Sequence, residues 1–315
     1  MLAIKTLTNN LTTFRRSVRL MGDKFEISVV GNNPLLADEQ IDIAINEINR
    51  VDRLLSTFSE DSNLNRINRN AGIEPVKVSS EVFRLIDRAL QISDLTHGAF
   101  DITYFAGTGY TGDDAALATN ADVKIAPSPV MLTNYKSVVT DAAKQTIFLK
   151  EKGMRIGFGA NSRGYAADRA KYMLQMNGVS SGVINAGGDL LTWGTQPNLK
   201  PWTVAAADPE KRDQPFAHLN ISNMAFATSV NTEKYTSISD KKFVNVVTAK
   251  KGFPVSEITS VSIVSPTAEL SDAMASPIIN IGVNAGLYLI NQLNQIACII
   301  IDDQNRIYTS KDVSI

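Results

Sequence analysis

The chain is poor in the residue types from which many common sites are built. Its 315 residues include one cysteine, Cys298, and two histidines, His97 and His218. One cysteine cannot form an intramolecular disulfide, and two histidines exclude a histidine-rich metal centre. Any catalytic metal ion would therefore be held by oxygen ligands. Cys298 lies in the apolar run QIACIIID, where we expect a buried side chain rather than a reactive thiol.

Excess charge and long apolar runs are also lacking. Lys and Arg number 31 against 32 Asp and Glu, a formal net charge of -1, so no field favours nucleic acid or an anionic membrane. No apolar run approaches the length of a transmembrane helix, and the N-terminal stretch MLAIKTLTNNLTTFRRSV has no signal-peptide core. We expect no nucleic-acid partner and no transmembrane segment. We also expect either a cytoplasmic protein or an export segment that is absent from this sequence.

The first part of the chain carries clear local patterns. Lys24–Val30 alternates like a half-buried strand, and Asn33-Pro34 precedes apolar residues at helical spacing, which predicts a helix over 34–56. A polar segment over 59–72 predicts a long loop. Ser79 or Ser80 is the expected cap of a second helix that ends near Thr96-His97-Gly98, where His97 is a candidate partner of the helix dipole rather than a catalytic residue.

The middle and the end of the chain predict many short strands and two late helices. Residues 106–129 lack periodicity and predict a surface excursion. Helical signals return at Glu269–Ala275 and Ala285–Leu293. The expected strands are Ser137–Thr140, Thr146–Leu149, WTVAAA, FAHLNIS, MAFATS, FVNVV, TSVSIVS, IACIIID and RIYTS. This order predicts an α+β fold with layers of helix on a mostly antiparallel sheet.

The stretch Arg155–Leu190 predicts a strand, a glycine-bearing loop, a helix and a second strand. The loop contains Gly157, Gly159 and Gly164, so backbone N–H groups gather at a helix N-terminus that attracts anions. The spacing matches neither the Walker A loop nor the dinucleotide fingerprint. Two readings stay open, a phosphate site and an ordinary tight connection.

A second pattern lies at Ser271–Pro277. Asp272 and Ser276 are four residues apart, so a carboxylate and a hydroxyl project from one helix face. Mg²⁺ accepts such an oxygen pair, completed by a backbone carbonyl, water and a ligand phosphate. The alternative is a solvated acidic start of a helix. Arg163 is likewise either a phosphate ligand or a solvated side chain, and Asp101 either a turn residue or an acceptor for a heterocycle.

Several weak motifs in a fixed order resemble one known family. They are Met21-Gly22, Gly98 to Thr103, Gly159 to Asp168, Asn185 to Asp189, Pro201 to Val204, Asp208-Pro209, Ala227 to Ser229 and Ser271 to Ala275. Together they resemble the ApbE family of FAD:protein FMN transferases. The resemblance begins near Ser17, so we expect a polar lead-in over 1–16 and one domain over 17–315.

The resemblance implies a layered α/β/α T-fold that binds FAD with Mg²⁺. It implies transfer of FMN from FAD to a threonine or serine hydroxyl of an acceptor flavoprotein, with release of AMP. It also implies a place in the periplasm or on the outer face of the cytoplasmic membrane, commonly as a lipoprotein. The implied flavin-site residues are Met21, Phe58, Ala99, Phe100, Asp101, Gly157, Arg163 and Asn245. The implied metal ligands are the Ala160 carbonyl, Asp272 and Ser276, and the implied catalytic residues are Asp272 and Arg163.

The chain departs from the family pattern at three motifs. The usual Gly-Gly-x-x-Lys-Gly loop reads Gly159 to Gly164 with Ala160 second and Arg163 in place of lysine. Thr-Ser-Gly-x-Tyr becomes Thr228 to Thr232, and His-x-x-Asp-Pro becomes Asn245 to Ala249. Asn245 cannot act as a general base, a loss worth on the order of 10²–10⁴ in rate where such a base is used. A non-catalytic FAD-binding relative is therefore the alternative hypothesis.

Overall fold

A large antiparallel sheet organises the structure, a computed structural model that describes residues 11–57, 59, 62–105, 134–159, 161–207, 215–231 and 257–311. Every neighbouring pair of strands in it is antiparallel. The spatial order is β1 (Thr12–Leu20), β2 (Asp23–Gly31), β8 (Gly182–Ala186), β9 (Asp189–Trp193), β12 (Ala225–Val230), β13 (Ile258–Ser265), β14 (Ala297–Asp302) and β15 (Ile307–Thr309). The predicted class, α+β with a mostly antiparallel sheet, is confirmed.

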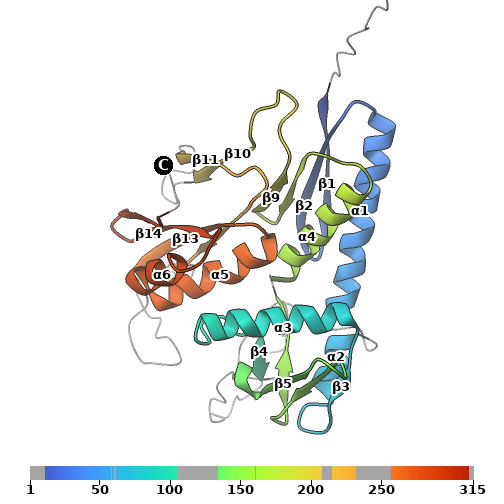
Figure 1. Ribbon diagram of the computed structural model, residues 1–315, viewed down its shortest axis with the longest axis vertical. Coiled ribbons are helices and arrows are strands. Elements are labelled where there is room, and N and C mark those ends of the chain that lie inside the picture. Colours follow the sequence, from blue (N-terminus) through green and yellow to red (C-terminus); the bar gives the residue numbers. More distant parts are fainter. Residues whose placement is uncertain are drawn as a thin grey trace, which may run out of the picture.

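Four helices cover one face of this sheet. They are α1 (Pro34–Leu55), α4 (Asn161–Met176), α5 (Ala268–Ile281) and α6 (Val283–Ile290). Helices α1 and α4 pack against each other over β2 and β8, while α5 packs on β12 and β13 and α6 on β14 (Figure 1). Inward-facing side chains such as Ile27, Ile184 and Leu191 lie in register across neighbouring strands and are fully buried beneath α1 and α4.

A β-hairpin covers part of the opposite face. Its strands are β10 (Thr203–Ala207) and β11 (Pro215–Asn220). Val204 and Leu219 of the hairpin form a small apolar cluster with Phe226 and Ile299, which point away from the helices because side chains alternate along a strand. The described layers over this half of the sheet are therefore helices, sheet and hairpin, which explains why β13 and β14 are buried almost throughout.

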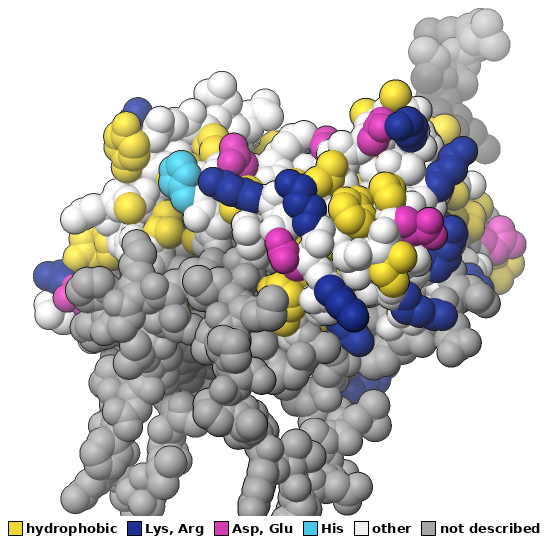
Figure 2. All heavy atoms as spheres, turned by 90° about the horizontal axis from the view of Figure 1, so that it is seen from below, with side chains coloured by type: hydrophobic (Ala, Val, Ile, Leu, Met, Phe, Trp, Pro, Cys, Tyr) yellow, Lys and Arg dark blue, Asp and Glu magenta, His cyan; other side chains and the backbone are white. Residues whose placement is uncertain are grey.

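A smaller part of the fold lies beyond α3 (Ser80–Leu95), which lies below α4 and α5 in Figure 1. It contains α2 (Asn63–Arg69), the short 3-10 helix Tyr135–Ser137, the sheet β3 (Val76–Lys77), β6 (Thr146–Leu149) and β5 (Val138–Asp141), and the pair β4 (Thr103–Phe105) and β7 (Met154–Ile156). Lys and Arg side chains are interspersed with Asp and Glu on the described part of the face shown in Figure 2. None of the described helices has the length and apolar character needed to cross a bilayer.

Local signals locate most helix boundaries correctly. The Asn33 side chain accepts hydrogen bonds from the N–H groups of Leu35 and Leu36, and α1 ends at Leu55, one residue short of the prediction. Ser79, not Ser80, caps α3 by accepting from the N–H of Val82. Helix α5 is longer than predicted, since it runs through Pro277 and ends only at Gly282, whose φ of 88° terminates the helix.

Two segments differ from the sequence-based expectation. Part of the loop expected over 59–72 is the helix α2, because the Ser62 hydroxyl caps it and Leu64 and Ile67 bury one face. Strand β1 begins at Thr12, ahead of residue 17 where we placed the start of the domain. As an edge strand it is half exposed, and its polar sequence hides the pattern. The excursion at 106–129 and the strand expected at FVNVV lie outside the described residues.

Candidate functional site

The candidate site lies where the N-terminal turns of α4 and α5 meet. Strand β7 leads through Gly159, which has a φ of 48°, into α4, and the Ser162 hydroxyl donates to the Gly159 carbonyl over 2.7 Å. Gly164, in the first turn of α4, faces the backbone of α5. A Cβ there would lie 2.7 Å from the carbonyl oxygen of Ala268, a distance that real side chains do not reach. Only glycine allows the two helices to approach this closely.

Two turns of the large sheet bring carboxylates to the same place. Asp23 follows the β1–β2 turn, and its Oδ2 lies 3.9 Å from Nε of Arg163 on α4. Asp189 follows Gly187 and Gly188 in the β8–β9 turn, where both glycines have positive φ. A Cβ on Gly187 would lie 2.6 Å from Oδ2 of Asp23 and 3.3 Å from Nε of Arg163. This glycine thus leaves room for the ion pair beside the turn.

The carboxylates of Asp189 and Asp272 are held in a poorly solvated environment. Burial and, to a smaller extent, the neighbouring Asp189 raise the pKa of Asp272 to about 7 against the opposing effect of Arg163. Burial also raises the pKa of Asp189 to about 6, although the N–H of Thr228 donates to its Oδ1 over 3.3 Å. The protein therefore holds negative charge here at an electrostatic cost, which a bound cation would relieve.

Three polar side-chain atoms at this junction are buried without a hydrogen-bond partner. They are Oδ1 of Asn161, Nε of Arg163 and Oδ2 of Asp272. Among the described residues, no other buried side-chain nitrogen or oxygen lacks a partner. Unpaired buried polar atoms are costly, so native proteins rarely keep them without a reason. Two unpaired oxygens and one unpaired guanidinium N–H on the N-terminal turns of α4 and α5 suit a ligand that carries both a cation and an anion.

Ser276 lies one helical turn after Asp272 and is exposed. Its hydroxyl is 3.0 Å from the hydroxyl of Ser229 on β12. The preceding residue, Thr228, is exposed, and its hydroxyl pairs with Ser262 of β13 over 2.8 Å on the opposite face of the sheet, because side chains alternate along a strand. The hydroxyl that was predicted to share a helix face with Asp272 thus lies beside one further hydroxyl group, that of Ser229 on the sheet.

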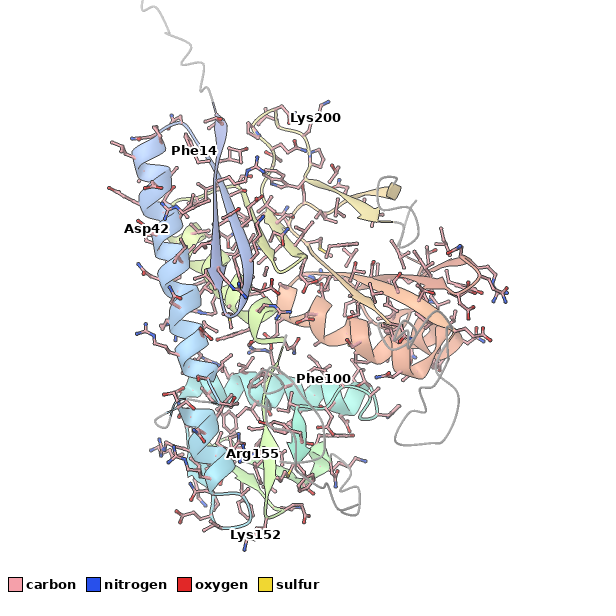
Figure 3. The ribbon with its side chains drawn as sticks, turned by 180° about the vertical axis from the view of Figure 1, so that it is seen from behind. Phe14, Asp42, Phe100, Lys152, Arg155 and Lys200 are labelled. Carbon is pink, nitrogen blue, oxygen red and sulfur yellow. The ribbon has the colours of Figure 1, made fainter. Side chains whose placement is uncertain are left out.

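The residues expected at the flavin lie around β4 and β7. Pairing of Thr103 with Ile156 brings the segment 99–101 beside Gly157, whose N–H donates to the carbonyl of Ile102. Phe100 packs against both large apolar clusters, beside α3 and above the strand that carries Arg155 (Figure 3). Asp101 accepts hydrogen bonds from Thr103 and from the N–H of Tyr135, so its carboxylate is engaged in a turn.

The remaining expected residues divide into two groups. Met21 forms the β1–β2 turn with a φ of 52°, two residues before Asp23, and packs at the edge of the main core. Phe58, Ala160 and Asn245 lie outside the described residues. The structure therefore brings together Arg163, Asp272 and Ser276, and it connects Met21 to them through the turn that carries Asp23.

Sequence reasoning missed Asp23 and Asn161 as members of this junction. Asp23 follows the Met21-Gly22 pair, which marks a turn but does not indicate what the turn faces, and its partner Arg163 is 140 residues away. Asn161 lies within the loop from Gly159 to Gly164 but received no role of its own from the sequence. Its first position in α4, where polar side chains often satisfy backbone groups, was the available signal. Asp189 entered the sequence analysis only as the last residue of the motif from Asn185 to Asp189.

The chain belongs to the ApbE family, whose profile matches residues 21–300. A protein from Klebsiella pneumoniae named FAD:protein FMN transferase is 27% identical over 301 residues, which cover 93% of this chain and 90% of the relative. A protein of the same name from Salmonella typhimurium is 26% identical over 271 residues, covering 84% and 77%. The chain is thus a transferase of this family.

Solved structures show the same fold. The ApbE protein of Thermotoga maritima superposes with a TM-score of 0.77 at 24% identity and covers 95% of this chain and 97% of its own. The flavin transferase ApbE of Vibrio cholerae gives a TM-score of 0.77 at 19% identity, covering 96% and 98%. These similarities establish that the antiparallel α+β architecture extends over nearly the whole length of both relatives.

Proposed function

We propose that the protein transfers FMN from FAD to a threonine or serine hydroxyl of an acceptor flavoprotein and releases AMP. The hydroxyl oxygen forms a bond to the phosphorus of the FMN half, and the bond from that phosphorus to the bridging oxygen breaks. AMP leaves with the bridging oxygen, and the hydroxyl proton is released. The curated relatives are named FAD:protein FMN transferase, and their similarity spans most of this chain, which supports transfer of FMN from FAD to a protein.

The observation that carries the proposal is the group of unpaired buried atoms at the α4–α5 junction. Nε of Arg163 is a charged donor suited to a phosphate oxygen, and Oδ2 of Asp272 is an anionic acceptor. A diphosphate with an accompanying cation satisfies both at once. Neither group alone requires such a ligand, but their juxtaposition at two helix N-termini does favour one.

The residues present fit Mg²⁺ as the accompanying cation. We assign Asp272 and Ser276 as its side-chain ligands and the Ala160 carbonyl as a third, and all donate hard oxygen atoms. Asn161 offers a further unpaired oxygen at the same junction. When bound, Mg²⁺ would neutralise diphosphate charge and polarise the phosphorus under attack. The raised pKa of Asp272 fits a carboxylate that is stabilised only when a cation arrives.

The protein's own groups then have distinct roles. Arg163 binds a phosphate oxygen and offsets the negative charge that develops during transfer. Asp189, held by the N–H of Thr228, keeps negative potential beside the cation site. Met21, Ala99, Phe100, Asp101 and Gly157 are proposed to surround the flavin, together with Phe58 and Asn245 from outside the described residues.

The direct test is a titration of the protein with FAD, with and without Mg²⁺, followed by flavin fluorescence. We expect Mg²⁺ to tighten binding of the wild type. In Asp272→Ala the Mg²⁺ concentration needed for this tightening should rise by roughly 10–100-fold. Asp42→Ala removes an exposed carboxylate of α1 that pairs with Arg16, and it should leave the titration unchanged. An unchanged Mg²⁺ dependence in Asp272→Ala would refute the assigned site.

A second candidate function is FAD binding without catalysis. It is favoured by the sequence at 245–249, where the ionisable pair of the family motif is replaced. Incubation of FAD, Mg²⁺ and a threonine-bearing acceptor separates the two functions. Release of AMP in proportion to flavin on the acceptor supports transfer, whereas tight FAD binding with no AMP from any acceptor supports the second function.

We also propose that the protein works in the periplasm or on the outer face of the cytoplasmic membrane. The family resemblance supports this location. Cell fractionation of the native host, followed by detection of the protein with an antibody, tests it. Recovery of the full-length protein in the cytoplasmic fraction alone would contradict it.

A further inference from the structure

Asp168 of α4 supplies an N-terminal cap to a different helix. Its Oδ1 accepts the N–H of Ala268 and its Oδ2 accepts the N–H of Glu269, each over 2.9 Å. Both N–H groups belong to the first turn of α5 and have no partner within that helix. The side-chain hydroxyl of Thr267, the cap residue of α5 itself, accepts from the N–H of Leu270 over 3.4 Å and does not reach the N–H groups of Ala268 and Glu269. Helix α5 therefore depends on α4 for the satisfaction of its first turn.

Two further contacts hold the same turn. Gly164, one turn before Asp168 on α4, faces the carbonyl of Ala268 at backbone contact distance. From α3, Arg88 donates to Glu269 through Nε over 3.1 Å and through Nη2 over 2.9 Å. The start of α5 is thus fixed on two sides by hydrogen-bonded carboxylates and on a third by steric contact.

We call the contacts of Asp168 and Gly164 with the first turn of α5 the α4–α5 joint. This joint lies between the two halves of the candidate site. Arg163 directly precedes Gly164 on α4, and Asp272 is one helical turn beyond Ala268 on α5. A shift of α5 along or away from α4 would change the separation of the guanidinium from the carboxylate. A binding site of this kind requires its ligating atoms to be held within about 0.5 Å of the geometry that binds the ligand.

We propose that Asp168 is a positioning residue that sets the placement of Asp272 and Ser276 on α5 relative to Asn161 and Arg163 on α4. The ligands in question rest on the function proposed above. Burial raises the pKa of Asp168 to about 6 against the opposing effect of the two N–H bonds. The carboxyl is therefore mostly ionised at pH 7.5, and both of its oxygens can accept. Glu269 and Lys171 are the other charged groups that act on it.

The test compares Asp168→Asn with the wild type at pH 7.5. An amide has one accepting oxygen and presents N–H groups to the second backbone donor, so one bond to α5 is lost. The ratio of the FAD dissociation constants without and with Mg²⁺ should fall at least tenfold. The dissociation constant without Mg²⁺ should stay within twofold, because the flavin and adenosine contacts are not moved.

Glu47→Gln is the matched control. Glu47 accepts from Nε of Arg169, the residue after Asp168, and from Arg50. Within the described residues, no hydrogen bond or ion pair joins Glu47 to α5. The substitution disturbs α4 at its α1 side and should leave both dissociation constants unchanged. Equal behaviour of Asp168→Asn and Glu47→Gln would overturn the inference.

A second variant moves the joint without changing charge. In Gly164→Ala the new methyl group pushes against the Ala268 carbonyl, and the Mg²⁺-coupled tightening should fall as in Asp168→Asn. Hydrogen exchange read by mass spectrometry reports the joint directly, since the amides of Ala268 and Glu269 should exchange at least tenfold faster in Asp168→Asn. This variant and readout also decide the matter if Asp168→Asn does not fold.

The outcomes separate this inference from the proposed function. A wild type that binds no FAD, with or without Mg²⁺, would refute the proposed function. The exchange measurement then decides the inference, and unchanged exchange of Ala268 and Glu269 in both variants would overturn it. FAD binding that is Mg²⁺-coupled in the wild type and equally coupled in both variants would overturn the inference alone.

Discussion

Arg163 has surroundings that a surface arginine would not have. Its Nε is buried without a hydrogen bond, and the nearest carboxylate oxygen, on Asp23, is 3.9 Å away. Asp189 and Asp272 act on the same region electrostatically. An arginine that lies close to several carboxylates but forms no hydrogen bond with them is free to bind a phosphate oxygen. Its planar guanidinium presents N–H donors in a different geometry from the ammonium group of the lysine that is usual at this position in the family.

We predict that Arg163→Gln weakens FAD binding by roughly 10–100-fold. A hydrogen bond to a charged group contributes about 1.5–3 kcal/mol, and 1.4 kcal/mol corresponds to a factor of ten. Flavin fluorescence titration measures the effect. Arg155→Gln, on the exposed side of β7 just before the glycine loop, is the control and should bind FAD as the wild type does. Equal affinities of the two variants would contradict the role given to Arg163.

At the scale of elements, the β14–β15 hairpin depends on a single carboxylate. Asp302 is 1% exposed and accepts from the N–H groups of Gln304 and Arg306, from Nε of Arg306 over 2.6 Å and from the Tyr308 hydroxyl. Burial alone would raise the pKa of Asp302, but these hydrogen bonds outweigh it and lower the pKa to about 2. The turn is thus stabilised by the ionised form.

We predict that Asp302→Asn lowers the free energy of unfolding by about 1–3 kcal/mol at pH 7, because charge-assisted bonds are replaced by neutral ones. The pKa of Asp302 is depressed in the folded state, so its stabilisation is present above the unfolded pKa of about 4 and is lost as the pH falls towards 2. Urea unfolding at a series of pH values measures this. The gap between variant and wild type should close at low pH, and a gap independent of pH would contradict the assignment.

At the scale of the whole molecule, one core joins the large sheet to the small sheets. Leu64, Ile147 and Met154 of the smaller part belong to the same buried cluster as Phe25 and Ile184 of the large sheet. Polar contacts reinforce the connection. Glu81 of α3 accepts from Arg50 of α1 over 2.7 Å and from the Tyr165 hydroxyl of α4 over 2.8 Å. The helix that lies between the two parts is therefore tied to both helices above it.

We predict that the protein unfolds in one cooperative transition and that Glu81→Ala lowers its midpoint without splitting it. Removal of the carboxylate leaves Arg50 and the Tyr165 hydroxyl without that partner, at a cost of about 1–3 kcal/mol. Thermal unfolding followed by circular dichroism and by tryptophan fluorescence tests this. Two separated transitions, or different midpoints from the two probes, would contradict a single core.

Elements with strong local signals were predictable, and elements that depend on their neighbours were not. Helix α1 follows from Asn33, Pro34 and apolar spacing, because capping and amphipathicity act over a few residues. Strand β1 did not follow, because an edge strand with one exposed face carries polar residues and is stabilised by β2. In the candidate site, local patterns made Arg163 and Asp272 candidates and the family resemblance assigned their roles, whereas Asp23 was not predicted.

The sequence by itself determined most of the helices, the antiparallel class of the sheet and the family, since periodicity, caps and ordered motifs are properties of contiguous residues. Only the tertiary structure decided that Asp23, Asp189, Arg163 and Asp272 share one junction and that Asp168 caps a helix other than its own. The physical reason is separation along the chain. Ion pairs and caps between residues about a hundred positions apart exist only after the sheet turns and the α4–α5 packing have brought those positions together.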